Sequence, residues 1–334
     1  PPPPATHTSR CSSAASDVYK RQPLHTQTVI AFVWDFDKTL IPSNMQDPIF
    51  DAYGVEADQF WTEVDGLVDH YAREGVIVQK DTAYLGHLLT YVREGIFEDL
   101  SNERLTELGA LLEPAPGMPE FMQLTRDHVA DVPDFAAEGI TVEHYVVSTG
   151  LRAMIEGSTF IDVVDGIWAN TFIEQVAEPG YLDRLPVPAP PAPIAQVGYS
   201  IDNTSKTRAL FEINKGINKN PSLDVNARMS QDQRRVPMRN MVYIADGPSD
   251  VPAFSILNTA GGRTLGVYTL EPVNNHSKVK QLQEQGRIQG MAEADYRPGK
   301  PAYLWLMDTL DQIGHEIVEA RRQAMGAIAN PPGH

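Results

Sequence analysis

Residues 28–39 have the sequence TVIAFVWDFDKT, and this stretch decides the predicted fold. Its first seven residues are apolar or β-branched without a break, which is typical of a strand buried on both faces of a parallel sheet. The polar residues Asp35, Asp37 and Thr39 come directly after or close behind this strand. Because ligands of open α/β sheets bind beyond the carboxyl ends of the strands, the stretch also predicts a functional site at that edge.

Further apolar runs and helical stretches alternate along the rest of the chain. The runs occupy residues 143–147, 163–171, 241–245 and 264–268. Residues 206–214 and 251–257 are helical in pattern, and residues 301–322 have the periodicity of one amphipathic helix. Strands that alternate with helices predict an α/β fold with a Rossmann-like, doubly wound, mainly parallel sheet.

A helical insertion is predicted directly after the first strand. Phe60, Val64, Val68 and Tyr71 recur at helical spacing, and Ser101 stands where a helix would be capped. We expect the aromatic residues of this part to form its core. We expect a discontinuous α/β core at residues 23–42 and 113–325. A small helical cap is expected at residues 43–112, and a short flexible tail at residues 326–334.

Residues 1–22 are set apart from the rest. Residues 12–22, SSAASDVYKRQ, are similar to the in-frame translation of a transposase sequencing adapter, so we expect a non-native, disordered leader here. Cys11, the one cysteine of the chain, lies in this segment. The remainder therefore offers no thiol or disulfide chemistry.

The charge balance limits the classes of partner. The chain has 44 acidic and 27 basic residues and a net charge of −17, which argues against nucleic acid or an anionic membrane surface as partner. No stretch approaches the roughly 20 apolar residues of a membrane span. We expect a cytoplasmic protein that acts on a small molecule, and the sequence does not predict its oligomeric state.

Polar residues follow three of the predicted strands. Besides Asp35 and Asp37, these are Ser148, Thr149 and Gly150 after the second run, and Asp246 and Asp250 after the fourth, while Lys206 begins a helical stretch. Several carboxylates at one edge repel each other unless a cation compensates them. Oxygen ligands without histidine or cysteine favour Mg²⁺.

These motifs, in this order, resemble the four motifs of the haloacid dehalogenase-like superfamily, and the resemblance extends over about residues 28–300. It implies that Asp35 is a nucleophile that becomes phosphorylated and that Asp37 is the general acid and base. It also implies that Mg²⁺ is held by the Asp35 carboxylate, the Asp37 backbone carbonyl and Asp246. The remaining residues would bind the phosphoryl group (Ser148, Thr149, Gly150 and Lys206) or support the site (Thr39 and Asp250).

Asp37 separates the classes within this superfamily. Its dehalogenases lack an acid two residues after the nucleophile, because a halide leaving group needs no proton, and its ion-pumping ATPases carry threonine there. The sequence therefore favours a phosphatase that hydrolyses a small phosphate monoester. The alternatives are a phosphotransferase or pyrophosphate-cleaving enzyme with the same intermediate, and a catalytically idle binding protein.

Three details depart from the closest pattern or leave a choice open. The position of the insertion resembles the cap of phosphoserine-phosphatase-like members, but residues 41–46 contain no glutamate to hold a substrate ammonium group. Phosphoserine is therefore not the expected substrate. The fourth motif begins with Ala245 in place of glycine, and Lys215 competes with Lys206 as the phosphate-binding lysine. Lys38 either reaches the site or is solvated.

Overall fold

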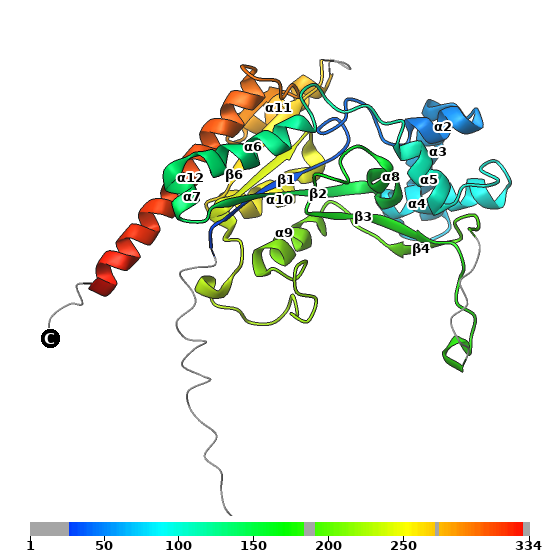
Figure 1. Cartoon of the computed structure of the whole chain (residues 1–334). Coiled ribbons are helices and arrows are strands. Elements are labelled where there is room, and N and C mark those ends of the chain that lie inside the picture. The colour runs from blue at the N-terminus through cyan, green and yellow to red at the C-terminus, as the bar shows by residue number, and fades with distance from the viewer. Residues whose placement is uncertain (1–26, 184–190, 271–273, 330–334) are drawn as a thin grey trace, which may run out of the picture.

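The computed structural model describes residues 27–183, 191–270 and 274–329, and in these ranges seven strands form one sheet (Figure 1). The order across the sheet is β4–β3–β2–β1–β5–β6–β7. All neighbouring pairs are parallel except β3 and β4. The mainly parallel α/β sheet that the sequence predicts is confirmed. The strands are β1 (Val29–Trp34), β2 (Thr141–Leu151), β3 (Gly166–Ile173), β4 (Gln196–Tyr199), β5 (Met241–Ala245), β6 (Arg263–Tyr268) and β7 (Gly290–Glu293).

Strand β1 lies in the middle of the sheet and is buried along its whole length. It pairs with β2 on one side and with β5 on the other. Its side chains alternate between two apolar clusters, with Phe32 and Trp34 in one and Ala31 and Val33 in the other. The uninterrupted apolar pattern of residues 28–34 therefore reflects burial on both faces.

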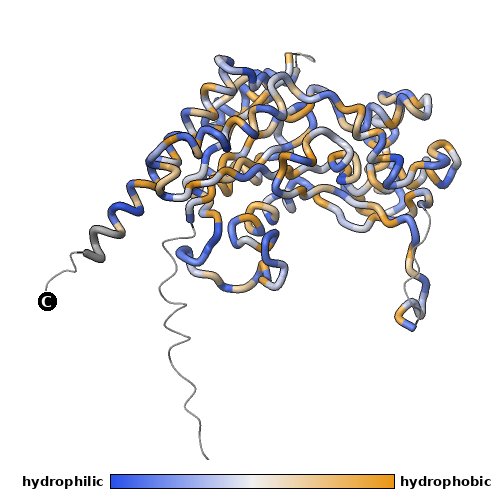
Figure 2. Tube along the Cα trace, viewed as in Figure 1, coloured by the Kyte–Doolittle hydropathy of each residue, from blue (hydrophilic) through white to orange (hydrophobic). Residues whose placement is uncertain are grey.

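Helices cover both faces of the sheet, which confirms the doubly wound arrangement. The cluster around Phe32 and Trp34 includes side chains of α6 (Glu120–Asp131), α7 (Pro133–Ala137) and α12 (Pro301–Ala329). The opposite cluster includes side chains of α9 (Lys206–Lys215), α10 (Val251–Thr259) and α11 (Asn274–Glu284). Figure 2 shows hydrophobic and hydrophilic residues alternating along α12, as expected for a helix with one face on the core.

Four helices between β1 and α6 gather at one end of the sheet, whereas α12 extends from the other end (Figure 1). Aromatic rings fill their interior: the centroid of Phe60 lies 4.9 Å from that of Phe50 and 5.2 Å from that of Tyr91. The Ser101 side chain caps the last of these helices by accepting from the Arg104 amide at 3.0 Å. The four helices are α2 (Asp47–Tyr53), α3 (Ala57–Arg73), α4 (Lys80–Arg93) and α5 (Asn102–Gly109).

A glycine-mediated crossing joins this helical insertion to the core. Helix α5 packs on α8 (Arg152–Gly157), which follows β2. A Cβ atom on Gly109 would lie 2.1 Å from the Met154 carbonyl oxygen, and one on Gly157 would lie 1.9 Å from the Thr106 carbonyl oxygen. Only glycine permits this close approach of the two backbones.

The boundaries differ from the sequence prediction in several places. Strand β3 begins at Gly166 rather than at 163, because the Asp165 carboxylate accepts from the His144 amide and from Arg126, both at 2.9 Å, and turns the chain there. The four-residue strands β4 and β7 were not predicted, and α12 extends beyond residue 322. Short 3₁₀ helices are η2 (Tyr181–Asp183), η3 (Gln231–Gln233), η4 (Met238–Asn240) and η5 (Pro248–Asp250).

Two predictions fall wholly or partly outside the described residues. The predicted leader, residues 1–22, lies outside them, as do residues 330–334 of the predicted tail. Within the described ranges, no helix has the length and apolar character needed to cross a membrane.

Candidate active site

Three neighbouring strands bring the predicted site residues to one edge of the sheet. Asp35 follows β1, Asp246 follows β5, and Ser148 lies near the end of β2. The Asp35 amide donates to the Ile244 carbonyl at 2.9 Å, so the pairing of β1 with β5 continues up to the candidate nucleophile. Because β1 is central, its carboxyl end lies between the other two motifs.

The loop after Asp35 is held by its backbone. The amides of Thr39, Leu40 and Ile41 all point to the Phe36 carbonyl oxygen, at 3.2, 2.9 and 3.2 Å. The Tyr296 hydroxyl donates to the Thr39 carbonyl at 2.9 Å. The buried Thr39 hydroxyl itself has no hydrogen-bond partner among the described residues. The structure therefore gives Thr39 a place in the loop through its main chain, not through its side chain.

Lys206 is buried between two carboxylates. Its Nζ donates to Asp35 Oδ1 at 2.8 Å and to Asp250 Oδ1 at 2.7 Å. The three side chains are 1%, 9% and 0% exposed, respectively. The start of α9 is fixed by Asp202, whose Oδ1 accepts from the Ser205 amide at 2.6 Å.

Lys215, the alternative lysine, is directed elsewhere. Its Nζ donates to the Ala227 carbonyl at 2.7 Å and to the Val225 carbonyl. Of the two lysines on α9, Lys206 is the one that the fold brings to the acidic cluster.

Asp250 is occupied by hydrogen-bond donors, whereas Asp246 is not. Besides Lys206, the Tyr243 hydroxyl donates to Asp250 Oδ1 at 2.7 Å and the Ser249 hydroxyl donates to Oδ2 at 2.8 Å. Within the described part of the chain, no hydrogen bond reaches Asp35 Oδ2 or the Asp246 carboxylate. Carboxylate oxygens of Asp35, Asp246 and Asp250 lie within 4.8 Å of one another.

These carboxylate oxygens fit a small divalent cation. Within the cluster, the oxygens that accept no hydrogen bond belong to Asp35 and Asp246, and carboxylate oxygens are the ligand type that Mg²⁺ prefers. The oxygens of Asp250 hold Lys206 in place instead. The geometry thus distinguishes two candidate ligands from a third acid that positions the lysine.

Burial and mutual repulsion raise the pKa values of the acids. Burial raises the pKa of Asp35 well above its usual value, although Lys206 opposes the shift. Burial raises the pKa of Asp37 to about 7, against the Met45 amide that donates to its Oδ1 at 3.0 Å. Burial and the neighbouring Asp250 raise the pKa of Asp246 to about 6. One ammonium does not balance these carboxylates, and an added cation would favour their charged forms.

Ser148, Thr149 and Gly150 lie at the same edge, where their hydrogen bonds go to each other and to Asn170. The Ser148 hydroxyl accepts from the Gly150 amide at 3.0 Å, and the Thr149 carbonyl accepts from Asn170. A Cβ atom on Gly150 would lie 2.3 Å from the Met45 side chain. Over the described ranges no hydrogen bond joins this segment to the acidic cluster, so its part in phosphate binding stays a prediction.

Several residues at the site were not predicted from the sequence. Tyr243 lies inside an apolar strand and Met45 inside a loop, so neither carries a sequence signal for its position. Asp81 is in the first turn of α4, and burial together with Asp202 raises the pKa of its carboxyl. Tyr84 of the same helix accepts from Gln46 at 2.9 Å, and the preceding Met45 donates to Asp37, so α4 packs against the loop that leads away from the site.

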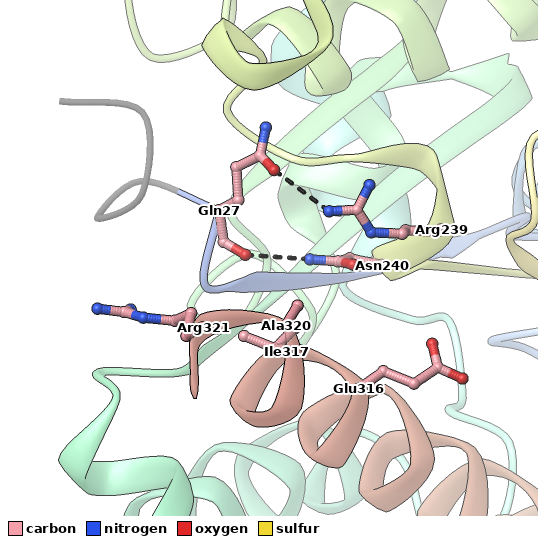
Figure 3. Close-up of a pocket in the computed structure, with 7 residues that line it drawn as sticks. All are labelled: Gln27, Arg239, Asn240, Glu316, Ile317, Ala320 and Arg321. Carbon is pink, nitrogen blue, oxygen red and sulfur yellow. Dashed lines mark hydrogen bonds between the residues drawn. The ribbon is translucent and has the colours of Figure 1, made fainter. Parts of the chain in front are cut away.

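A second hollow lies at the opposite edge of the sheet, near the amino ends of β1 and β5 (Figure 3). Its polar groups are largely paired with each other. Arg239 donates to Gln27 Oε1 at 3.3 Å, and Asn240 donates to the Gln27 carbonyl at 3.2 Å. Arg321 is 2.8 Å from Glu138. Among the described residues, none that lines this hollow belongs to the acidic cluster.

The fold and the site together extend the resemblance that the sequence motifs carry. A doubly wound parallel sheet brings the DxDxT aspartates, the motif lysine and the acidic pair 246 and 250 to one edge, in the order of the haloacid dehalogenase-like superfamily. The chain belongs to the same family as a protein of Borreliella burgdorferi, which is described as uncharacterized. The two are 38% identical over 289 residues, which cover 85% of this chain and 97% of that protein.

Other comparisons are more distant. No known protein-family model matches the chain. A HAD family hydrolase from Salmonella enterica serovar Typhi has a TM-score of 0.45 and 14% identity, over 76% of this chain and 66%, just under two thirds, of that one. A substrate-bound phosphoserine phosphatase has a TM-score of 0.45 and 15% identity, over 81% and 96% of the two chains. Similarity this distant carries no functional information about this chain.

Proposed function

We propose that the chain is a Mg²⁺-dependent phosphatase that hydrolyses a small phosphate monoester through a phosphorylated Asp35. The observation that carries this proposal is the contact of Lys206 with Asp35. The Asp246 carboxylate lies beside this pair, and no donor among the described residues reaches it. A buried nucleophile, a fixed cation next to it and oxygen ligands for a metal are the parts that phosphoryl transfer requires.

Asp35 is proposed to attack phosphorus and to displace the alcohol of the substrate. The bond to the leaving oxygen breaks as the bond from Asp35 forms, which gives an aspartyl phosphate and splits the reaction into two displacements. Water then attacks this intermediate and releases inorganic phosphate. Lys206, which touches Asp35, would hold a phosphoryl oxygen during both displacements.

Asp37 is proposed to move the protons. Burial raises its pKa to about 7 in the metal-free protein, and the same burial favours a protonated carboxyl that can protonate the departing alkoxide. Once deprotonated, it can accept a proton from the attacking water. A carboxyl with an ordinary pKa would be almost wholly ionised at this pH and would lack the proton for the first step.

Mg²⁺ would be held by the Asp35 and Asp246 carboxylates and by the Asp37 backbone carbonyl. When bound, it would supply positive charge to the nucleophile and to the incoming phosphoryl group. Asp250 would keep Lys206 in position through the 2.7 Å contact.

Residues 43–112 are proposed to act as a cap over the site. The aromatic interior gives the insertion its own core, and α4 contacts the loop after Asp37 through the 2.9 Å hydrogen bond from Gln46 to Tyr84. A cap in this place excludes water and contributes to the choice of substrate. The substrate class is a small phosphorylated metabolite.

Hydrolysis of 4-nitrophenyl phosphate tests the proposal. The protein should release phosphate with Mg²⁺, lose activity in EDTA, and lose it in Asp35→Asn. The exposed Asp51→Asn on α2 is the matched control, with the same change of charge and no expected loss. Activity that survives Asp35→Asn would remove the nucleophile from the proposal. Transfer of phosphate to an added alcohol in preference to water would identify a phosphotransferase instead.

A further inference from the structure

A hollow next to the acidic cluster opens on the side of η5 and α11. Its lining includes Lys38, Asp246, Ser249, Asn275 and Lys278. Asp246 borders both the hollow and the candidate metal site, so the two are neighbours. The mechanism proposed above uses neither Asn275 nor Lys278. We refer to this hollow as the α11 subsite.

Asn275 lines the α11 subsite and carries a buried amide nitrogen without a partner among the described residues. The residue is 5% exposed, and its side-chain Nδ2 has no hydrogen-bond partner among the described residues. An unsatisfied buried amide is unfavourable for folding. Such a group is expected to persist where a ligand accepts from it.

Two lysines bring positive charge to the same hollow. Lys38 and Lys278 both line the hollow together with Asp246. No ion pair involves either ammonium group within the described ranges, in a chain whose net charge is −17. Lys38 also has a φ of 56°, a left-handed conformation that non-glycine residues rarely adopt. The surrounding loop must therefore hold Lys38 in this conformation.

We propose that the α11 subsite binds a second anionic group of the substrate, a carboxylate or a second phosphate. This inference rests on the proposed phosphatase function and specifies its substrate class. The reacting phosphoryl group is met by Lys206, so the ammonium groups of Lys38 and Lys278 and the amide of Asn275 remain for another acceptor. Charge-assisted hydrogen bonds of this kind favour acidic oxygens over a neutral hydroxyl.

A matched substrate series tests the inference. Propyl phosphate has no second acidic group, 3-phosphonooxypropanoate has a carboxylate, and propane-1,3-diyl bisphosphate has a second phosphate. Homologues with two to five carbons vary the distance between the reacting phosphate and the second acidic group. We expect Lys278→Gln and Asn275→Ala each to lower kcat/KM for the carboxylate or the bisphosphate by about 10- to 100-fold. Propyl phosphate makes no contact with the subsite, so its kcat/KM should fall by much less, and any loss that Lys278→Gln causes through the neighbouring Asp246 should be common to all three substrates. The arm that responds identifies the second group.

Lys280→Gln is the control, since Lys280 lies on the same helix, is exposed, and contacts Glu284 at 3.8 Å. Equal losses for all three substrates, or no loss for any, would overturn the inference. Calorimetric binding of the same three compounds in EDTA provides a readout that does not depend on turnover. If no compound is hydrolysed, the phosphatase proposal fails. A binding preference for the acidic compounds that disappears in Lys278→Gln would still support the subsite. If the unsubstituted protein shows no such preference, the subsite is refuted.

Discussion

Replacing Lys206 by methionine tests the charge balance at the site. The ammonium group is 1% exposed and contacts two carboxylates that are 9% and 0% exposed, those of Asp35 and Asp250. Removing one partner from a buried ion pair costs about 3–5 kcal/mol, because an uncompensated charge stays behind. Two carboxylates lose a partner here, but Asp35 can take up a proton. We therefore expect Lys206→Met to lower the free energy of unfolding by about 3–5 kcal/mol at pH 8 in EDTA.

The loss should depend on pH in a definite direction. Without the ammonium that opposes the burial effect, the pKa of Asp35 in the folded variant rises further above its unfolded value. Between the folded pKa of Asp35 in the unsubstituted protein and its higher folded pKa in the variant, only the folded variant retains a proton that the unfolded chain has released. Over that range the cost of the substitution rises with pH, by about 1.4 kcal/mol per unit for one retained proton. The cost of the substitution should be smaller at pH 5.5 than at pH 8.

Urea denaturation followed by tryptophan fluorescence, in EDTA at both pH values, measures these quantities. Lys280→Met is the control, because its exposed contact with Glu284 is expected to contribute less than about 0.5 kcal/mol. A loss below about 1 kcal/mol at pH 8 would contradict the range expected for a buried pair. An equal loss at both pH values would refute the proton argument.

Three further predictions concern proton transfer, metal binding and packing. Asp37→Asn should lower kcat for an alkyl phosphate by about 10²–10⁴-fold and less for 4-nitrophenyl phosphate, whose leaving group needs little protonation, and equal losses would exclude the general-acid role. The raised folded pKa values of about 7 for Asp37 and about 6 for Asp246 mean that the metal-free protein loses stability as pH rises from 4 to 7. Binding of Mg²⁺ should therefore release protons, which calorimetry measures. Mg²⁺ should also stabilise the folded protein more at pH 7.5 than at pH 5, which thermal melts measure. Gly109→Ala should destabilise the fold by about 1–3 kcal/mol, because the added Cβ meets the Met154 carbonyl oxygen. Gly86→Ala, with open space around it, should stabilise the fold by about 0.5–1 kcal/mol. Urea titrations that rank the two variants in reverse would contradict the crossing of α5 and α8.

The sequence predicts those parts of the fold that a repeating physical constraint leaves in the pattern. Strand β1 is buried on both faces, so every residue from Val29 to Trp34 is apolar and the strand is evident. Strands β4 and β7 lie at the two edges of the sheet and are four residues long. Short edge strands have few buried positions, and so no distinctive pattern marks them.

The site divides in the same way. Asp35, Asp246 and Lys206 follow or begin regular elements, and the meeting of parallel strands at one edge brings them together as expected. Tyr243 and Asn275 are different, because their importance depends on which atom lies opposite the side chain. Sequence spacing contains no information about that partner, whereas the 2.7 Å contact of Tyr243 with Asp250 and the unpartnered amide of Asn275 become evident only in three dimensions.

The central place of β1 has a consequence for how the chain folds. Its two neighbours, β2 and β5, begin at Thr141 and Met241, so the strand that is made first completes its pairing only after more than two hundred further residues. The contact between Lys206 and Asp35 spans 171 residues. Contacts of such long range close late and slowly during folding. A growing chain therefore has no cation site until the core around it is nearly complete, and metal affinity measured during refolding should rise together with the last cooperative step.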